Sequence, residues 1–380
     1  MCKDKIGIRT VIVLILLLTL MPFDVSAAFP DLPNEEWDSF DGAVPDDIKD
    51  ALGSNAFDSE EKYFEEIEKI SKSENIAALI LDTVGLKLGE VGKLFLLILS
   101  LLVLAALFSA VSDGVDNPAL SSALRFCSSG ALCGSVVYIF YSHFGMLEEF
   151  FEKLGTMMNG MIPITASIWA MGGNVSTAGA GSATFYVMLS LCEGIWSKTV
   201  IPVCCVLTVL GFCDAMSEEV RTGRIMNAVK KIYNFILGLI MTVLLSSLAA
   251  QTALAASADT TAARAARLVS GTVIPVIGGS VGETFRTVAA GVSYLKNIFG
   301  VGGIVMIILL VLPIGISVLL TRFVFLICGG IADMLGCSVE ARLLENLGEV
   351  YGCMLGVIVG ASTMFIMALC VFMQTVVAVA

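Results

Sequence analysis

Long stretches without Asp, Glu, Lys or Arg alternate along the chain with shorter charged segments. Charged side chains are costly in hydrocarbon, so these stretches locate membrane-crossing helices, each of which needs about 20 predominantly apolar residues. The pattern predicts an all-α, polytopic membrane protein with about seven transmembrane helices and one or two partial insertions. The long stretches cover residues 94–112, 126–147, 154–192, 199–213, 232–258, 297–321 and 350–380, and shorter ones cover 268–282 and 323–332.

The stretch at residues 154–192 is too long for a single crossing. Glycines interrupt it at Gly172-Gly173-Asn174 and again at Gly179-Ala180-Gly181. Glycine adopts the backbone angles that end a helix at little steric cost. We therefore expect a hairpin or a broken helix in this part of the chain.

Proline positions indicate an internal repeat in the second half of the chain. Two pairs of aliphatic-proline dipeptides have nearly equal spacing, Ile162-Pro163 with Ile201-Pro202 and Ile274-Pro275 with Leu312-Pro313. Each pair brackets a glycine break and precedes a charged loop and a long apolar run. This predicts a two-fold internal repeat with Gly/Pro-broken segments, a pattern that in transporters points to a binding site near the membrane midplane. Coincidence in a compositionally monotonous membrane sequence is the competing explanation.

The N-terminus has the pattern of a secretory signal peptide. Lys3, Lys5 and Arg9 precede an apolar run at residues 10–21, and Val25-Ser26-Ala27 is a small-residue cleavage site. The alternative is an uncleaved anchor, although a run of about 12 residues is short for a crossing. We divide the chain into a signal peptide (1–27), an acidic extracytoplasmic leader with amphipathic helices (28–90), a first transmembrane hairpin (91–150) and two repeat halves (151–260 and 261–380).

The leader carries most of the chain's negative charge. Residues 31–74 contain 15 acidic and four basic residues, against a net charge of -12 for the whole chain. We expect residues 29–55 to be extended or poorly ordered, because they are rich in Pro, Asp and Asn. An amphipathic helix should follow, and a second should lead into the membrane at residues 76–88. The apolar face of the first has helical spacing: Tyr63, Phe64, Ile67 and Ile70.

Composition excludes several classes of protein. Hydrophobic residues make up 57% of the chain and charged residues only 15%, whereas soluble domains carry about 25% charged residues. No stripe of Lys and Arg could neutralise a nucleic-acid backbone, so nucleic acid is not an expected partner, whereas membrane lipid is. The loop at 214–231 contains a basic cluster, which the positive-inside rule places in the cytoplasm. The cluster consists of Arg221, Arg224, Lys230 and Lys231.

Ionisable residues and glycines inside the apolar stretches are the candidates for a pathway or cavity, because burial of a charge in a membrane is expensive. For Glu193 and Lys198 the alternative to a pathway role is a position in a turn at the membrane interface, beside Trp196. For Glu283 and Arg286 the alternative is that both charges are solvated at the interface. We expect the two glycine breaks to face each other across the repeat interface. The candidate residues are Gly172, Gly173, Asn174, Gly278, Gly279, Gly282, Glu193, Glu283 and Arg286.

The remaining chemistry-bearing residues favour packing. Gly352, Gly356 and Gly360 recur every four residues, which predicts a helix face for close packing against another helix. The cysteines lie in apolar runs without zinc-ligand spacing, and the single histidine, His143, is expected at the membrane interface. We expect no metal, no cofactor and no enzymatic activity, because nucleotide-binding, hydrolase and metalloprotease motifs are missing.

Three stretches resemble the stage III sporulation protein AE family, and the likeness covers roughly residues 60–380. The resemblance implies a polytopic protein of the mother-cell membrane that faces the forespore. It also implies an eight-protein operon assembly that forms a channel or feeding apparatus, with a separate ATPase as the energy source. No catalytic residue of the family can be carried over. The stretches are Gly173-Asn174-Val175-Ser176-Thr177-Ala178-Gly179, Glu218-Glu219-Val220-Arg221-Thr222-Gly223 and Ile274-Pro275-Val276-Ile277-Gly278-Gly279-Ser280-Val281-Gly282-Glu283.

Two functions therefore remain open. The protein is either a membrane component of a multiprotein sporulation channel or feeding apparatus, or a secondary-transporter-like permease for a small solute. The family resemblance favours the first, and the Gly/Pro repeat fits both. Co-purification with other stage III sporulation membrane proteins would favour the channel, and solute uptake by the protein alone in liposomes would favour the permease.

Overall fold

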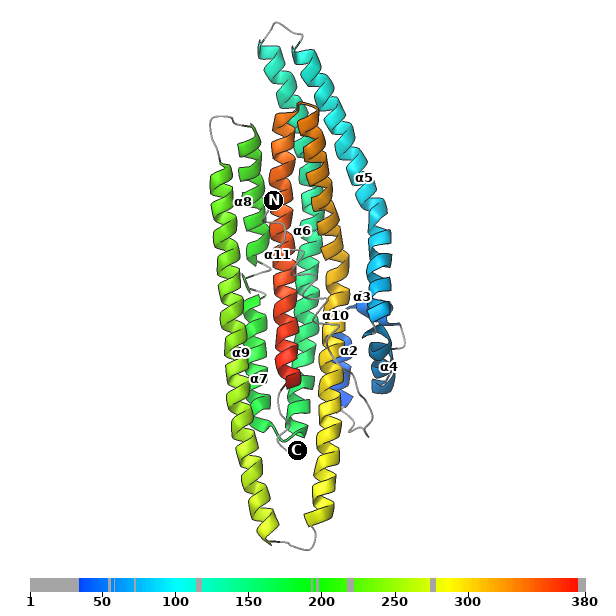
Figure 1. The fold of residues 1–380 in the computed structure, drawn as a ribbon, viewed down its shortest axis with the longest axis vertical. Helices are drawn as coiled ribbons and strands as arrows, with labels where there is room; N and C mark the ends of the chain where they lie inside the picture. Colours follow the sequence, from blue (N-terminus) through cyan, green and yellow to red (C-terminus); the bar gives the residue numbers. More distant parts are fainter. Residues whose placement is uncertain are drawn as a thin grey trace.

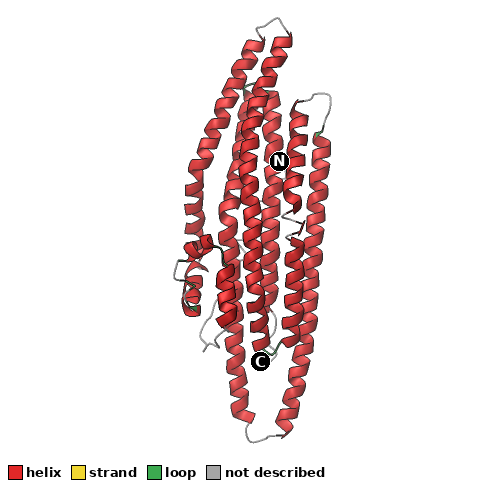
Figure 2. Ribbon diagram, turned by 180° about the vertical axis from the view of Figure 1, so that it is seen from behind, coloured by secondary structure: helices red, strands yellow, loops and turns green. Residues whose placement is uncertain are grey.

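A computed structural model describes residues 34–53, 56–57, 59–71, 73–113, 118–192, 194–195, 198–216, 222–273 and 278–374. Within these ranges the chain is helical apart from short turns, which confirms the all-α prediction (Figure 2). The helices are α2 (Asn34–Ala43), α3 (Asp46–Leu52), α4 (Glu60–Ser71), α5 (Ser73–Asp113), α6 (Pro118–Met171), α7 (Val175–Cys192), α8 (Lys198–Met216), α9 (Gly223–Val273), α10 (Gly278–Met334) and α11 (Ser338–Gln374).

The long helices form one elongated bundle (Figure 1). Helices α5 and α6 are antiparallel, α7 and α8 follow each other end to end in the same direction, and α9, α10 and α11 alternate in direction. The antiparallel pair α10 and α11 lies between α5 and α6 on one side and α7, α8 and α9 on the other. This pair therefore contacts helices from both halves of the chain.

Six helices within the described ranges are long and apolar enough to cross a membrane. This confirms a polytopic membrane protein, with six candidate spans where the sequence predicts about seven helices. The spans in α10 and α11 are each 67% buried inside the protein, whereas those in α5 and α9 are each 17% buried. The candidate spans are Ala78–Val111, Gly130–Met171, Lys198–Ala215, Gly223–Leu254, Ala289–Met334 and Ser338–Gln374.

The continuity of α6 explains part of the difference between the predicted number of transmembrane helices and the number of candidate spans. It joins two charge-free stretches into a single helix of 54 residues, because its charged segment at 148–153 does not break it. In that segment Glu148, Glu149 and Glu152 are exposed, and Lys153 is paired with Glu149 at 2.7 Å. The expected boundary between residues 150 and 151 lies inside α6, and the boundary between 260 and 261 lies inside α9.

The expected glycine breaks in residues 154–192 have different outcomes. Gly172 to Asn174 form the turn between α6 and α7, as predicted. The second predicted break was wrong, since Gly179-Ala180-Gly181 lies within continuous α7. A Cβ atom at Gly181 would overlap the Trp169 ring on α6, so this glycine permits close approach of the two helices.

Residues 34–53 of the leader are folded, which corrects the expectation of an extended or poorly ordered segment in this part of the chain. Residues 34–43 and 46–52 form α2 and α3, and they pack with α4 against the lower half of the bundle in Figure 1. The predicted apolar face of α4 is confirmed, because Tyr63, Phe64 and Ile67 are buried and Ile70 is half-buried. Tyr63 stacks on Phe299 of α10 with 5.7 Å between ring centroids. Burial of these aromatic rings favours folding of the leader, an effect that its high content of charged residues does not predict.

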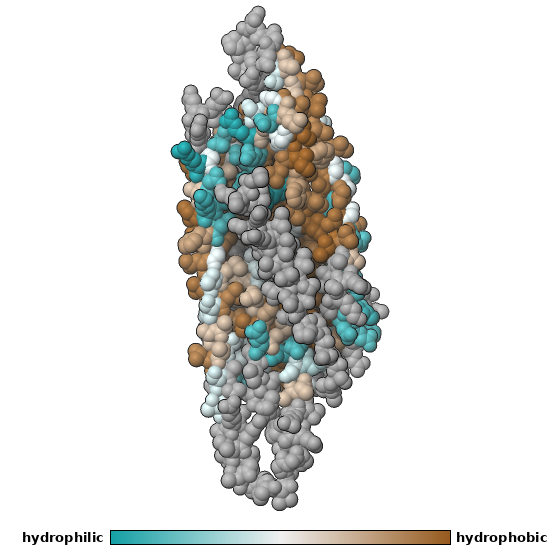
Figure 3. Space-filling model, viewed as in Figure 1, coloured by the Kyte–Doolittle hydropathy of each residue, from teal (hydrophilic) through white to brown (hydrophobic). Residues whose placement is uncertain are grey.

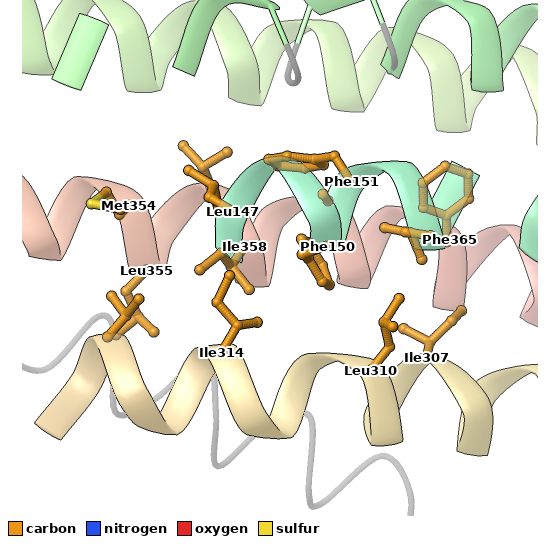
Figure 4. Packing of buried hydrophobic residues seen from close by; sticks show 14 of the residues in the cluster. Leu147, Phe150, Phe151, Ile307, Leu310, Ile314, Met354, Leu355, Ile358 and Phe365 are labelled. Atoms are coloured by element: carbon orange, nitrogen blue, oxygen red, sulfur yellow. The ribbon is translucent and has the colours of Figure 1, made fainter. Parts of the chain in front are cut away.

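Side chains from three long helices interdigitate at the centre of the bundle (Figure 4). Buried apolar groups exclude water and contribute roughly 25 cal/mol per Å² of area removed from it. His143 and the hydroxyl groups around it, described below, come from the same three helices, α6, α10 and α11. The labelled residues are Leu147, Phe150 and Phe151 of α6, Ile307, Leu310 and Ile314 of α10, and Met354, Leu355, Ile358 and Phe365 of α11.

Candidate functional site

A cavity of about 490 Å³ lies between α3, α5, α6 and α10. One wall is apolar and consists of α10 residues 309–314, including Leu310 and Ile314 (Figure 4). Pro313 has no N–H, so the carbonyl of Leu309 on the same wall loses its helical donor. The polar residues on the other walls are Asp47, Asp82, Thr83, Glu149 and Lys153.

The polar wall of the cavity has more negative than positive groups. Lys153 forms ion pairs with Asp47 of α3 and with Glu149 of its own helix. Asp47 and Glu149 are exposed, so the cavity opens to the surface beside the leader. Three carboxylates against one ammonium favour cations and protons over anions at this opening.

His143 lies inside the bundle, one helical turn from the cavity along α6. It is 8% exposed and so lies inside the protein, and its expected position at the membrane interface stays a prediction. Its Nδ1 is 2.9 Å from the carbonyl oxygen of Ile139 and 3.2 Å from the hydroxyl of Tyr351 on α11. Its Nε2 is 3.3 Å from the hydroxyl of Ser317 and 3.4 Å from that of Thr321, both on α10.

The hydroxyl groups of three residues therefore surround one imidazole ring. The ring also packs edge-on against Tyr351, with 5.3 Å between centroids. A buried polar group costs free energy unless it is hydrogen-bonded, and here both ring nitrogens have partners. Sequence alone could not find this site, because Ser317, Thr321 and Tyr351 lie more than 170 residues from His143.

Further polar contacts continue toward the upper end of the bundle in Figure 1. Lys230 of α9 forms an ion pair with Glu349 of α11. Above it, the Asn346 side chain donates to the carbonyl of Gly211 at 2.9 Å, and Asp214 accepts from the N–H of Gly223 at 2.6 Å. These contacts connect α8, α9 and α11.

A separate acidic contact lies in the lower half of the bundle. Asp259 of α9 accepts hydrogen bonds from the N–H groups of Ser176 at 3.0 Å and Thr177 at 2.8 Å. These are first-turn donors of α7, which have no partner within their own helix. Asp259 lies beyond the candidate span of α9, which ends at Leu254. Burial tends to raise the pKa of Asp259, but the hydrogen bonds from Thr177 and Ser176 outweigh it and the pKa is lowered.

The predicted residues at the first glycine break form a helix cap. Gly173 has φ 77°, and its N–H donates to Ala170 while the N–H of Asn174 donates to Trp169. This is a Schellman arrangement, which satisfies carbonyls at the end of α6. Asn174 is 2% exposed and its carbonyl begins α7. Gly172 and Gly173 thus end a helix directly after a candidate span.

The other predicted pathway residues are not brought to this turn by any described contact. Glu193 lies outside the described residues. The second glycine break lies at the start of α10, between candidate spans that end at Leu254 and begin at Ala289. The expectation that the two breaks face each other stays a prediction. The backbone of α10 in its first turns includes Gly278, Gly279, Gly282, Glu283 and Arg286.

The three glycines predicted for helix packing have unequal surroundings. A Cβ atom at Gly352 would lie 3.2 Å from the Arg322 guanidinium carbon, and one at Gly360 would lie 3.5 Å from Met241. A Cβ atom at Gly356 would meet no atom of a neighbouring helix within 4 Å among the described residues. Closer packing occurs at glycines that the sequence analysis did not select: Gly160, Gly181, Gly300, Gly302 and Gly303.

The cysteines and acids of the described chain do not gather around a common centre. The described cysteines are free thiols, and five of them are buried. No group of three His, Cys, Asp or Glu side chains suited to a metal ion occurs in the described ranges. In the bundle interior, His143 and its hydroxyl neighbours offer hydrogen-bond donors and acceptors.

These features define a polytopic all-α membrane protein with polar contacts between its helices. Comparison with known proteins places the chain more narrowly. It belongs to the stage III sporulation protein AE family, whose profile matches residues 59–376. It is similar to Stage III sporulation protein AE of Bacillus subtilis (strain 168), with 22% identity over 288 residues that cover 72% of this chain and 70% of the relative. No solved structure matches the chain.

Proposed function

We propose that this protein is a membrane component of a multiprotein sporulation channel or feeding apparatus that links mother cell and forespore. Family membership carries this proposal. The protein resides in the mother-cell membrane around the forespore, with residues 28–90 outside the cytoplasm. Its partners are other stage III sporulation membrane proteins, including a separate ATPase.

The folded leader supports an assembly role. Its apolar face is buried against α10 and α6, and its acidic residues are left on the outer surface. An ordered surface on which acidic residues outnumber basic ones favours docking of a protein with a complementary basic patch. The exposed acids of the described leader include Asp38, Asp46, Asp47, Asp50, Glu65 and Glu68.

The arrangement of charges supports the proposed orientation. The leader packs against the lower half of the bundle, whereas α9 begins near the opposite end with Arg224, Lys230 and Lys231 in its first turns (Figure 1). Positive residues beside a span favour the cytoplasm. An extracytoplasmic leader and a cytoplasmic start of α9 fit one orientation of α5 and α9.

The apolar outer surface supports contact with lipid and with other membrane proteins. Hydrophobic side chains cover the upper part of α5 in Figure 3, and the candidate spans of α5 and α9 are mostly unburied within this chain. Such faces are stable only beside lipid or other transmembrane helices. The exposed residues on α5 include Leu96, Leu97, Val103, Leu104, Leu107 and Val111.

A permease for a small solute is the second candidate function. The cavity beside Pro313 and the polar groups within the bundle favour it, because transporters bind substrates at helix irregularities that line a cavity. Under this alternative the protein would need no partner to move its solute.

Purification from sporulating cells in mild detergent tests the assembly role. The channel proposal expects other stage III membrane proteins to co-purify, and expects loss of at least one after the triple change Asp50→Lys, Glu65→Lys and Glu68→Lys in the leader. A matched control reverses two exposed acids near the other end of the bundle, Asp333→Lys and Glu345→Lys. Purification of the protein alone, together with solute uptake in liposomes, would instead establish the permease.

A further inference from the structure

We propose that His143 is a proton-binding site inside the bundle and that the cavity between α3, α5, α6 and α10 is the route by which water delivers protons to it. This inference concerns a site that neither the channel nor the permease function requires. It rests on the position of the ring relative to the cavity and on the hydrogen-bond partners of its two nitrogens.

The ring and the cavity are neighbours along three helices. His143 precedes the cavity residue Met146 by one turn of α6, and Ser317 follows the cavity residue Pro313 by one turn of α10. On α5, Lys87 follows the cavity residue Thr83 by one turn. One turn spans about 5.4 Å along a helix axis. The lining of the cavity thus lies about one helical turn from His143 and from its partner Ser317.

The partners of His143 suit both of its charge states. The carbonyl of Ile139 can only accept, so Nδ1 carries a hydrogen and donates to it. In the neutral ring, Nε2 then accepts from the hydroxyl of Ser317 or Thr321. In the protonated ring, Nε2–H donates to the same oxygen atoms once the hydroxyl hydrogens have rotated away.

The proton transfer is therefore balanced without movement of a helix. A hydronium ion or a proton-donating water in the cavity gives its proton to the Nε2 lone pair, directly or through the Ser317 hydroxyl. The donor is left as water or hydroxide in the cavity, where it returns to the bulk. Tyr351 lies 3.2 Å from Nδ1 and can accept a share of the Nδ1 hydrogen in either state.

Charged and titratable groups from the surrounding helices act on the ring in both directions. Lys87 of α5 opposes a positive imidazole, and Glu90, its ion-pair partner at 3.0 Å, favours it. The charged and titratable groups that act on the ring or on its hydroxyl partners are Lys87 and Glu90 of α5, Tyr351 of α11 and, through its interaction with Tyr351, Cys204 of α8.

The sequence makes a direct test possible, because His143 is the one histidine among 380 residues. Histidine labelled with ¹³C and ¹⁵N would give a single ring spin system by solid-state NMR of the full chain in lipid bilayers. Between about pH 4 and pH 9 we expect reversible conversion between the neutral ring, with hydrogen on Nδ1, and the doubly protonated ring. A ring that keeps one charge state over this whole range would overturn the proposal.

The role of the cavity is tested by filling it. Magnetisation transfer from water to the ring protons reports access of water to the labelled histidine. Thr83→Trp places an indole in the cavity, and we expect the transfer rate to fall at least about tenfold. Leu86→Trp is the matched control on the same helix, because Leu86 is exposed and lies outside the lining.

A second variant that fills the cavity keeps the test valid if Thr83→Trp misfolds. Ala51→Trp enters the cavity from α3, where Ala51 is exposed and tolerates a larger side chain. Either filling variant that retains the circular dichroism and gel-filtration profile of the wild type should slow the transfer. Unchanged rates in a folded filling variant would refute the cavity as the proton route.

Discussion

Asp259 of α9 caps a helix that begins more than 80 residues earlier in the chain, with 2.8 Å between its carboxylate oxygen and the N–H of Thr177 in α7. The same oxygen accepts from the hydroxyl of Thr177 at 2.8 Å. Negative charge is also favoured at a helix N-terminus by the helix dipole. The contact fixes the start of α7 against α9, directly after the turn that contains Gly173.

Replacement of Asp259 should therefore loosen α7. Asp259→Ala removes both carboxylate oxygens and with them three hydrogen bonds, and we expect a loss of about 1–2 kcal/mol, the usual value of a helix cap. Hydrogen exchange measured by mass spectrometry should show faster exchange in the first turn of α7. Asp333→Ala, an exposed acid on α10, is the control. Equal protection of α7 in the two variants would contradict the capping role.

The same contact predicts a dependence on pH. The pKa of Asp259 is lowered in the folded protein, so the carboxylate stabilises the fold fully above its ordinary pKa of about 3.9. This stability is lost as pH falls through the lowered value. Protection of the first turn of α7 should thus persist at pH 5 and decline below about pH 4. In Asp259→Asn the decline should be absent, which a pH series of the exchange measurement would show.

Glycine substitutions should distinguish packed from open helix faces. A Cβ atom at Gly160 would overlap that of Ala43 in α2, and neither atom can rotate away. We expect Gly160→Ala to destabilise the contact between α2 and α6 by about 1–3 kcal/mol through overpacking. The added methyl group of Gly356→Ala meets no other helix within 4 Å in the described part of the chain, so the change should be neutral or stabilise α11 by up to about 1 kcal/mol.

Thermal unfolding of the two alanine variants in detergent provides the measurement. A lower midpoint for Gly160→Ala and an unchanged or higher midpoint for Gly356→Ala are expected. If Gly356→Ala leaves the isolated chain unchanged but prevents co-purification of another membrane protein, its open face is a contact between chains. A large loss of stability for Gly356→Ala in the isolated chain would contradict the observed open surroundings.

Attachment of the leader to the bundle should depend on Phe299. Its buried ring contacts Trp37, Phe40 and Tyr63 from the leader. Phe299→Ala should cost about 3–5 kcal/mol of local stability, because a large buried ring is removed. Limited proteolysis should then cleave residues 34–71 much faster than in the wild type. Phe323→Ala, at a half-exposed position of the same helix, should leave the cleavage rate unchanged.

Thiol labelling tests the orientation of the leader. A cysteine at Ser39, which is exposed on α2, should react with an impermeant reagent in intact mother-cell protoplasts. A cysteine at Glu345, exposed on α11 near the opposite end of the bundle, should react only after permeabilisation. Both variants are best made with the exposed native cysteines Cys127, Cys205 and Cys213 replaced. Labelling of Ser39→Cys only after permeabilisation would reverse the orientation.

The sequence predicted those features that depend on local hydrophobic pattern. The charge-free stretches and the low fraction of charged residues predicted a membrane protein. The helical spacing of Tyr63, Phe64 and Ile67 predicted the apolar face of α4. Burial of apolar side chains and exclusion of charge from hydrocarbon act on each segment separately, so both can be deduced along the chain. The family resemblance rested on short motifs and is confirmed over residues 59–376.

Pattern alone failed where a segment's fate depended on a distant partner. The sequence of α2 and α3 is polar enough to predict disorder, but Phe40 and Ile48 are buried in a core completed by α10 and α4. The glycine spacing at 352, 356 and 360 predicted one continuous packing face. The structure instead packs Gly302 against Tyr63, a contact between residues more than 230 positions apart.

The chain's sequence by itself therefore determined that this protein is a helical membrane protein of its family, and where its apolar segments lie. Only the tertiary structure decided that α7 and α8 lie end to end, that Asp259 caps α7, and that His143 is buried among hydroxyl groups. The reason is physical: hydropathy sums over neighbouring residues, whereas a hydrogen-bond partner or a close helix contact depends on which faces meet after packing.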